Sequence, residues 1–74
     1  MDINKKVLLL ALAKKKQDES FKDILLMLEN SHLFTLKEGK KLLKELRQEE
    51  FITEESLTLK GITLAKDIEQ EFKV

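Results

Sequence analysis

Apolar residues recur at helical spacing along most of the chain, and this pattern predicts four helical segments. The first covers residues 3–16, which carry a dense apolar run without a helix breaker, and Asp2 or Asn4 is suited to cap its start. The second begins where Ser20 and Asp23 form a capping pair. Its apolar positions follow the i, i+3, i+4, i+7 pattern, and the polar residues near position 30 predict its end.

The third helix is predicted over about Thr35 to Gln48, because Thr35 and Glu38 have the spacing of a capping box. One arc of this helix, roughly 120° wide at about 100° per residue, is apolar and should face the core. Its members are Leu36, Gly39, Leu42, Leu43 and Leu46. Because glycine costs about 1 kcal/mol in a helix relative to alanine, Gly39 suggests that another helix backbone approaches closely there.

The pattern changes after Glu50. Residues 51–53 and 56–58 are short β-favouring stretches around the polar pair at 54–55, which predicts a very small hairpin. Helical spacing then returns, with a start near Thr58 or Lys60. The apolar stripe of this last helix is predicted to consist of Ile62, Ala65, Ile68 and Phe72.

Composition favours one small folded domain over residues 1–74. Of the 74 residues, 42% are apolar and 38% are charged, and proline and cysteine are absent. This is too apolar for a disordered tail, and no linker or repeat divides the chain. Without cysteine, stability must come from an apolar core rather than from disulfides, which fits a reducing compartment.

The formal net charge is zero, with 14 basic and 14 acidic residues, but the charges are unevenly distributed. Residues 1–48 hold eleven Lys or Arg and seven Asp or Glu, whereas residues 49–74 hold three and seven. Lysines at 5–6 followed by an apolar run at 7–13 resemble the start of a signal peptide. The run is far shorter than the roughly 20 residues of a membrane helix, so we expect a cytoplasmic protein without a membrane span.

Two stretches resemble winged-helix DNA-binding domains of the MarR-type and PadR-type regulators. Residues 42–52, LLKELRQEEFI, are similar to the end of a recognition helix and its entry into the wing. Residues 57–65, LTLKGITLA, are similar to the Leu-Thr-x-x-Gly-x-x-Leu exit from the wing. The resemblance implies a mainly α, winged helix-turn-helix fold with three helices, a two-stranded hairpin and a C-terminal helix. Glu50 departs from it, because the family usually has glycine there, and the wing is acidic where a DNA-binding wing usually carries Lys or Arg.

The third predicted helix presents a basic stripe beside its apolar arc, which suits a helix lying in the major groove. Charged stripes are also commonly just solvated, and that alternative stays open. A second basic group, Lys14 to Lys16 with Lys22, lies around the start of the second helix, where free N–H groups could meet a phosphate. The candidate DNA-binding residues are Lys37, Lys40, Lys41, Lys44, Arg47, Gln48 and Lys22.

No enzyme chemistry is expected from this sequence, and no catalytic residue, cofactor or metal ligand is assigned. His32 is the only histidine, and no cysteine can join it as a ligand. Ser20 and Thr35 are expected to cap helices, without a base beside them in the sequence. The two glycines are 22 residues apart, at positions 39 and 61, so they do not form a phosphate-binding loop.

Two classes of function therefore stay open. The first is a small transcriptional regulator that binds double-stranded DNA through the third helix. The second is a winged-helix protein-interaction module, which the zero net charge and the acidic wing favour. A homodimer is a further expectation, because two-fold symmetry would give two half-site contacts. Its candidate contact residues, on the first and last helices, are Leu10, Leu64, Ile68 and Phe72.

Overall fold

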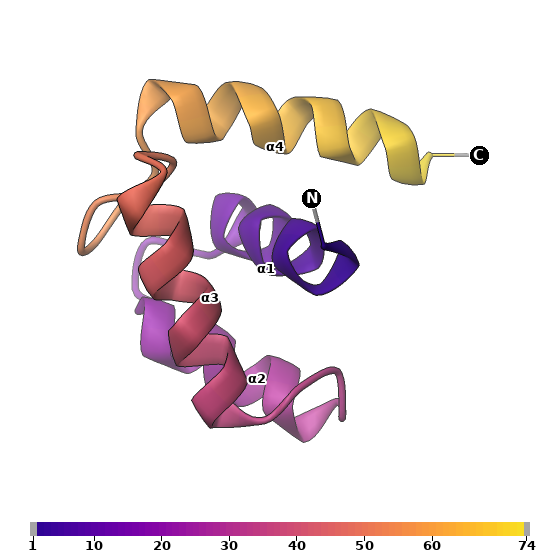
Figure 1. The fold of residues 1–74 in the computed structure, drawn as a ribbon, viewed down its shortest axis with the longest axis vertical. Helices are drawn as coiled ribbons and strands as arrows, with labels where there is room; N and C mark the ends of the chain where they lie inside the picture. Colours follow the sequence, from indigo (N-terminus) through magenta and orange to yellow (C-terminus); the bar gives the residue numbers. More distant parts are fainter. Residues whose placement is uncertain (1, 74) are drawn as a thin grey trace.

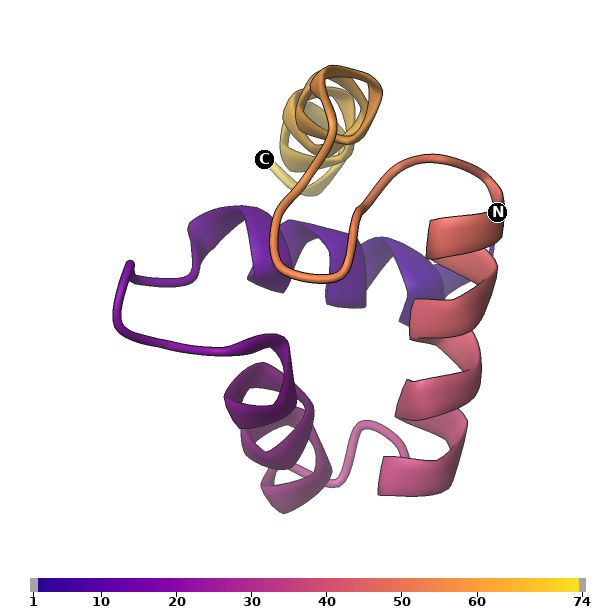
Figure 2. The ribbon, with the colours of Figure 1, turned by 90° about the vertical axis from the view of Figure 1, so that its left-hand side faces the viewer.

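The first helix, α1 (Ile3–Lys14), lies at the centre of the molecule, and the other three helices pack against it. In this computed structural model, which describes residues 2–73, α2 and α3 lie on one side of α1 and α4 crosses its other side (Figures 1 and 2). Leu8, Leu9 and Leu12 of α1 are completely or almost completely buried. The dense apolar run therefore makes α1 the core helix, as its sequence predicts.

The helix starts agree with the predicted capping residues. Asp2 caps α1, Ser20 caps α2 (Phe21–Asn30), Thr35 caps α3 (Leu36–Gln48) and Thr58 caps α4 (Leu59–Phe72). The capping box is complete in α2, where the Ser20 hydroxyl accepts from the Asp23 N–H at 3.1 Å and the Asp23 carboxylate accepts from the Ser20 N–H at 2.9 Å. In α3 the Thr35 hydroxyl accepts from the Glu38 N–H. Caps are local interactions, which is why the sequence locates them well.

Two helices end in Schellman motifs closed by residues other than glycine. After α2, His32 has φ 63° and its N–H donates to Glu29 O, while the Leu33 N–H donates to Leu28 O. After α3, Glu50 has φ 65° and the Phe51 N–H donates to Leu46 O at 3.0 Å. Glu50 thus makes the tight turn for which glycine was expected, at the cost of a left-handed conformation that strains a side chain with a Cβ.

The expected two-stranded wing does not form. Between residues 51 and 58 there is one isolated antiparallel bridge, Ile52 to Leu57, and no strand is found in residues 2–73. The Phe51 N–H bonds back to Leu46 O at the end of α3, and Thr58 already caps α4. Thr53 and Ser56 close the turn between them, with the Thr53 N–H donating to Ser56 O at 2.8 Å. Too few residues remain for a second ladder pair, so the fold is a compact all-α globule of four helices.

The end of α3 is joined directly to the start of α4. The Thr58 hydroxyl donates to Glu50 O at 2.6 Å, and the Thr58 N–H donates to Phe51 O at 3.1 Å. The Lys60 ammonium donates to Glu49 O and lies 4.7 Å from the centre of the Phe51 ring. The carbonyl groups of the three residues that follow α3 are therefore satisfied by Thr58 and Lys60 at the start of α4.

Both glycines lie where a larger side chain would collide. A Cβ at Gly61 would lie 1.9 Å from the Phe51 carbonyl oxygen, so this glycine allows α4 to sit against the chain that leaves α3. A Cβ at Gly39 would meet the side chains of Leu25 and Phe34, each at 2.8 Å. The close approach predicted at Gly39 is therefore to side chains, and the close backbone approach lies at Gly61.

The buried face of α4 differs from the predicted stripe. Ala65 and Ile68 are buried as expected, but Ile62 and Phe72 are 42% and 41% exposed. Gly61 is buried at the start of α4 instead. A helical period fixes which residues share a face, but not how far that face turns toward its neighbour. None of the helices in the described part of the chain is long and apolar enough to cross a membrane.

Candidate nucleic-acid interface

The exposed face of α3 carries the basic stripe that the sequence predicts. Leu42, Leu43 and Leu46 turn the opposite face of the helix into the core, so the long charged side chains must lie on the outside. Every member of the stripe is exposed to solvent. Its residues, called the α3 stripe below, are Lys37, Lys40, Lys41, Lys44, Arg47 and Gln48.

No cation of the α3 stripe forms an ion pair with any residue between 2 and 73. All four ion pairs in that range use lysines of α1 instead. The cations of the stripe are therefore not fixed by ion pairs within the described chain. Cations with no partner on the same molecule keep their full attraction for an external anion.

Two acidic residues near the end of α3, Glu45 and Glu49, are paired with Lys5. Its ammonium lies 3.1 Å from the Glu45 carboxylate and also donates to Glu49. The Lys5 side chain is only 12% exposed. The hydrogen bond to Glu49 raises the pKa of Lys5 above its ordinary value, with help from Glu45 and against the effect of burial. Lys5 thus neutralises carboxylates that would otherwise lie beside the stripe.

The α3 stripe is not electrostatically uniform. Lys37 and Lys41 line a hollow of about 380 Å³ together with the carboxylates of Asp2, Glu38 and Glu45. Lys40, Lys44 and Arg47 lie outside this hollow, on the other side of the stripe. These three cations are therefore the ones in the stripe that do not share a hollow with Asp2, Glu38 and Glu45.

The second basic group is largely used within the protein. Lys14 pairs with Glu69 at 3.1 Å, and the Lys15 ammonium donates to Glu19 O while lying 5.8 Å from the centre of the Phe21 ring. Lys22 is exposed at the start of α2, but no polar contact or hollow among residues 2–73 joins it to the α3 stripe. The structure thus brings the α3 candidates together and leaves Lys22 apart.

The start of α2 is already occupied by a carboxylate. Asp23 accepts from the Ser20 N–H, and this bond lowers the pKa of Asp23 below its ordinary value. A negative side chain at this position satisfies the helix terminus that a phosphate would need. His32 is exposed in its turn, and no three His, Cys, Asp or Glu residues of the described chain lie close enough together to hold a metal ion.

Three comparisons with known proteins give no further constraint. The chain matches no protein-family model, no curated protein and no solved structure.

Proposed function

We propose that this protein binds double-stranded DNA as a helix-turn-helix protein, with α3 in the major groove. The observation that carries the proposal is the α3 stripe, whose five cations are exposed and have no ion pair within residues 2–73. In a helix-turn-helix domain the second helix of the pair enters the groove, and α3 holds that position after α2 and its turn.

The physical basis of binding would be mainly electrostatic. A lysine or arginine that neutralises a phosphate releases condensed counterions, and this gain does not depend on base sequence. Lys40, Lys44 and Arg47 are suited to this role because they lie outside the hollow that Asp2, Glu38 and Glu45 line. Lysine lacks the planar fork with which arginine recognises guanine, so sequence discrimination should be modest.

The segment that replaces the wing should contribute little to phosphate binding. Glu54 and Glu55 are exposed at the tip of the loop over residues 51–58. A carboxylate facing the DNA backbone is repelled, so this loop must point away from phosphate or stay outside the interface. Binding would then depend on α3 alone, which favours a dimer for useful affinity.

The homodimer remains a prediction, but most of its predicted contact residues are buried or partly buried within their own chain. Ile68 is buried in the core of its own chain, and Leu10 and Leu64 are partly buried there. Of the predicted contact residues, Phe72 has the most free surface, at 41% exposure. Sedimentation at high protein concentration tests the dimer, and a monomeric mass would exclude it.

Fluorescence anisotropy with a mixed-sequence duplex tests DNA binding. Each phosphate contact contributes a slope of about −0.9 in log affinity against log salt, so five contacts would give about −4.5. A slope steeper than about −2.5 supports binding through the α3 stripe. Affinity that does not change with salt would exclude it and favour binding through an apolar surface.

A protein-interaction module is the second candidate, and one observation favours it. Leu26 and Met27 are 38% and 50% exposed on the outward side of α2, the helix that also carries Lys22. Neighbouring exposed apolar side chains of this kind suit a protein surface better than a phosphate backbone. Leu26→Ser with Met27→Ser should abolish binding of a protein partner at this surface and leave duplex affinity unchanged.

A further inference from the structure

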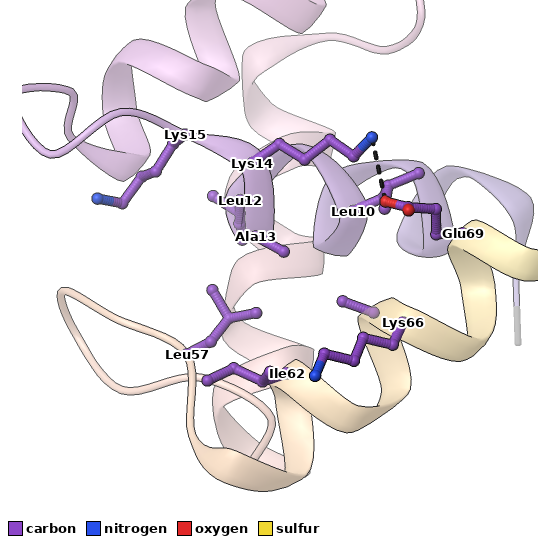
Figure 3. Close-up of a pocket in the computed structure, with 10 residues that line it drawn as sticks. Leu10, Leu12, Ala13, Lys14, Lys15, Leu57, Ile62, Lys66 and Glu69 are labelled. Atoms are coloured by element: carbon purple, nitrogen blue, oxygen red, sulfur yellow. Dashed lines mark ion pairs between the residues drawn. The ribbon is translucent and has the colours of Figure 1, made fainter.

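A groove lies between the second half of α1 and the first turns of α4, on a different surface from the α3 stripe. Figure 3 shows it with α1 above and α4 below. Its volume is about 440 Å³, within the range of about 300–1,000 Å³ that is typical of small-molecule sites. The apolar residues that line it are Leu10, Leu12, Ala13, Leu57, Ile62 and Ala65.

The groove is closed at both ends. Leu57 and the loop that carries it bound one end, and the ion pair between Lys14 and Glu69 lies across the other (Figure 3). Ile62, which the sequence predicted to be part of the core, instead leaves 42% of its surface exposed at this site. A short molecule fits such a site, whereas a helix laid along the groove would meet the loop or the ion pair.

The charges around the groove favour an anion. Its charged lining residues are Lys14, Lys15, Lys66 and Glu69. Glu69 is neutralised by Lys14, whose hydrogen bond lowers the pKa of this carboxyl. Lys15 is held by Glu19 O, but the Lys66 ammonium forms no ion pair within residues 2–73 and extends along α4 toward Ile62 (Figure 3).

We propose that this groove binds a small amphipathic carboxylate. The apolar body of the ligand would cover Leu57, Ile62 and Ala65, and its carboxylate would lie at the Lys66 ammonium. The area contributed by the apolar body supplies most of the binding free energy, and the ion pair selects the charge. This proposal does not depend on DNA binding.

A second copy of the chain is a less suitable occupant. In a symmetric dimer the same surface occurs on both sides, so two copies of the unpaired Lys66 ammonium would enter one interface. Like charges brought together in this way oppose association. A carboxylate ligand is instead attracted to the lysines around the groove.

The position of the groove also predicts a consequence for stability. α1 is the only helix against which α4 makes extensive contacts, so a ligand that touches both helices would reinforce the attachment of α4. A ligand that binds only the folded protein stabilises it by mass action. The melting temperature should therefore rise with ligand concentration.

The probe is decanoate, used below its micelle concentration, with decanol as the uncharged control of equal chain length. We expect NMR shifts confined to the groove, together with a rising melting temperature. An exposed ion pair contributes up to about 1 kcal/mol, so decanoate should bind about two- to fivefold more tightly than decanol. Equal affinities would overturn the proposed role of the carboxylate.

Two variants and a matched control locate the site. Ile62→Asp places a carboxylate in the groove and should abolish decanoate binding. Leu59→Asp adds the same charge to a leucine of α4 that is 79% exposed and outside the groove, and should leave binding unchanged. Lys66→Gln should weaken decanoate binding about two- to fivefold without changing decanol binding, and it alters no apolar packing.

Three results would overturn the proposal. The first is the absence of any shift with decanoate. The second is a set of shifts at Leu8 and Leu46, which would indicate that the amphiphile dissolves the core. The third is a set of groove shifts that depend on protein concentration without ligand, which would identify a second copy as the occupant.

Discussion

The lysines of α1 and those of α3 are the same residue type in opposite situations. Lys5, Lys6 and Lys14 of α1 each pair with a glutamate of another helix, Lys6 with Glu71 at 2.7 Å. The α3 stripe has no such partners within residues 2–73. The lysines of α1 therefore attach helices to one another, and those of α3 are available to an external anion. Charge alone does not distinguish the two roles, because the tertiary neighbours decide them.

The largest expected effect concerns the contact that holds the start of α4 against the chain leaving α3. The ion pairs between α1 and Glu69 and Glu71 require α4 to stay in this position. Gly61→Ala should destabilise the protein by roughly 3 kcal/mol, because its Cβ would meet the Phe51 carbonyl oxygen at 1.9 Å and the backbone must move. Urea denaturation measures this loss. Gly39→Ala is the matched control and should cost less, roughly 1 kcal/mol, since flexible side chains can yield there. Equal losses of stability would contradict the close backbone approach assigned to Gly61.

DNA affinity separates the two groups of lysines directly. Lys40→Gln with Lys44→Gln should weaken duplex binding about tenfold at low salt, because two phosphate contacts are lost. Lys6→Gln with Lys14→Gln removes the same charge from paired lysines and should weaken binding less than about threefold. Anisotropy titrations compare the two double variants. Equal losses would show that only the total charge matters and that α3 has no special role.

Lys5 links the two regions, since it pairs with Glu45 and Glu49 of the segment that carries the α3 stripe. Lys5→Met keeps the apolar stem but should cost about 1 kcal/mol of stability and weaken DNA binding, because two carboxylates become free beside the stripe. Denaturation and anisotropy measure the two effects. Stronger DNA binding by this variant would contradict the role given to Lys5.

The ion pairs of Lys5 with Glu45 and Glu49 also predict a dependence of stability on pH. The folded pKa of Lys5 is raised above its ordinary value of 10.5, so its contribution is complete below that pH. This contribution is lost as the pH rises through the folded pKa. Raising the pH above about 10.5 should therefore destabilise the Lys5→Met variant less than it destabilises the wild type. If the stability of both proteins fell equally with rising pH, the stabilising role of the Lys5 ion pairs would be contradicted.

The smallest expected effect is a gain in stability from the turn that follows α3. Glu50→Gly should stabilise the protein by about 1 kcal/mol, because glycine adopts the positive φ of this turn without the cost paid by a side chain. The change removes one acidic residue near Arg47 and should not weaken DNA binding. Thermal denaturation measures the gain, and a loss of stability would show that the Glu50 side chain has a compensating contact.

The sequence predicts the helix starts well and the tertiary pairs poorly, for physical reasons. Asp2, Ser20, Thr35 and Thr58 were found because a cap depends on residues within one turn. The contact between Lys5 and Glu49 joins residues 44 positions apart, and no local pattern indicates it. The exposure of the α3 stripe could be predicted, but its lack of partners depends on where α1 and α4 lie.

The wing failed as a prediction because β-favouring residues do not ensure pairing. Residues 51–53 and 56–58 have suitable composition, but Phe51 and Thr58 are already used by the ends of α3 and α4. Gly61 also carries a local signal, because a glycine three residues after a threonine cap suggests that another backbone lies against the first turn. Its partner could not be identified from sequence alone.

The most direct test of the central claim is an NMR titration of the isotope-labelled protein with a mixed-sequence duplex at low salt, repeated at moderate salt. Binding through α3 predicts salt-sensitive shifts from Lys37 to Gln48, strongest at Lys40, Lys44 and Arg47, with the α1 lysines unaffected. Shifts at α1 and α3 alike, or no shifts on α3, would contradict the claim that the unpaired cations of α3 form the DNA-binding surface.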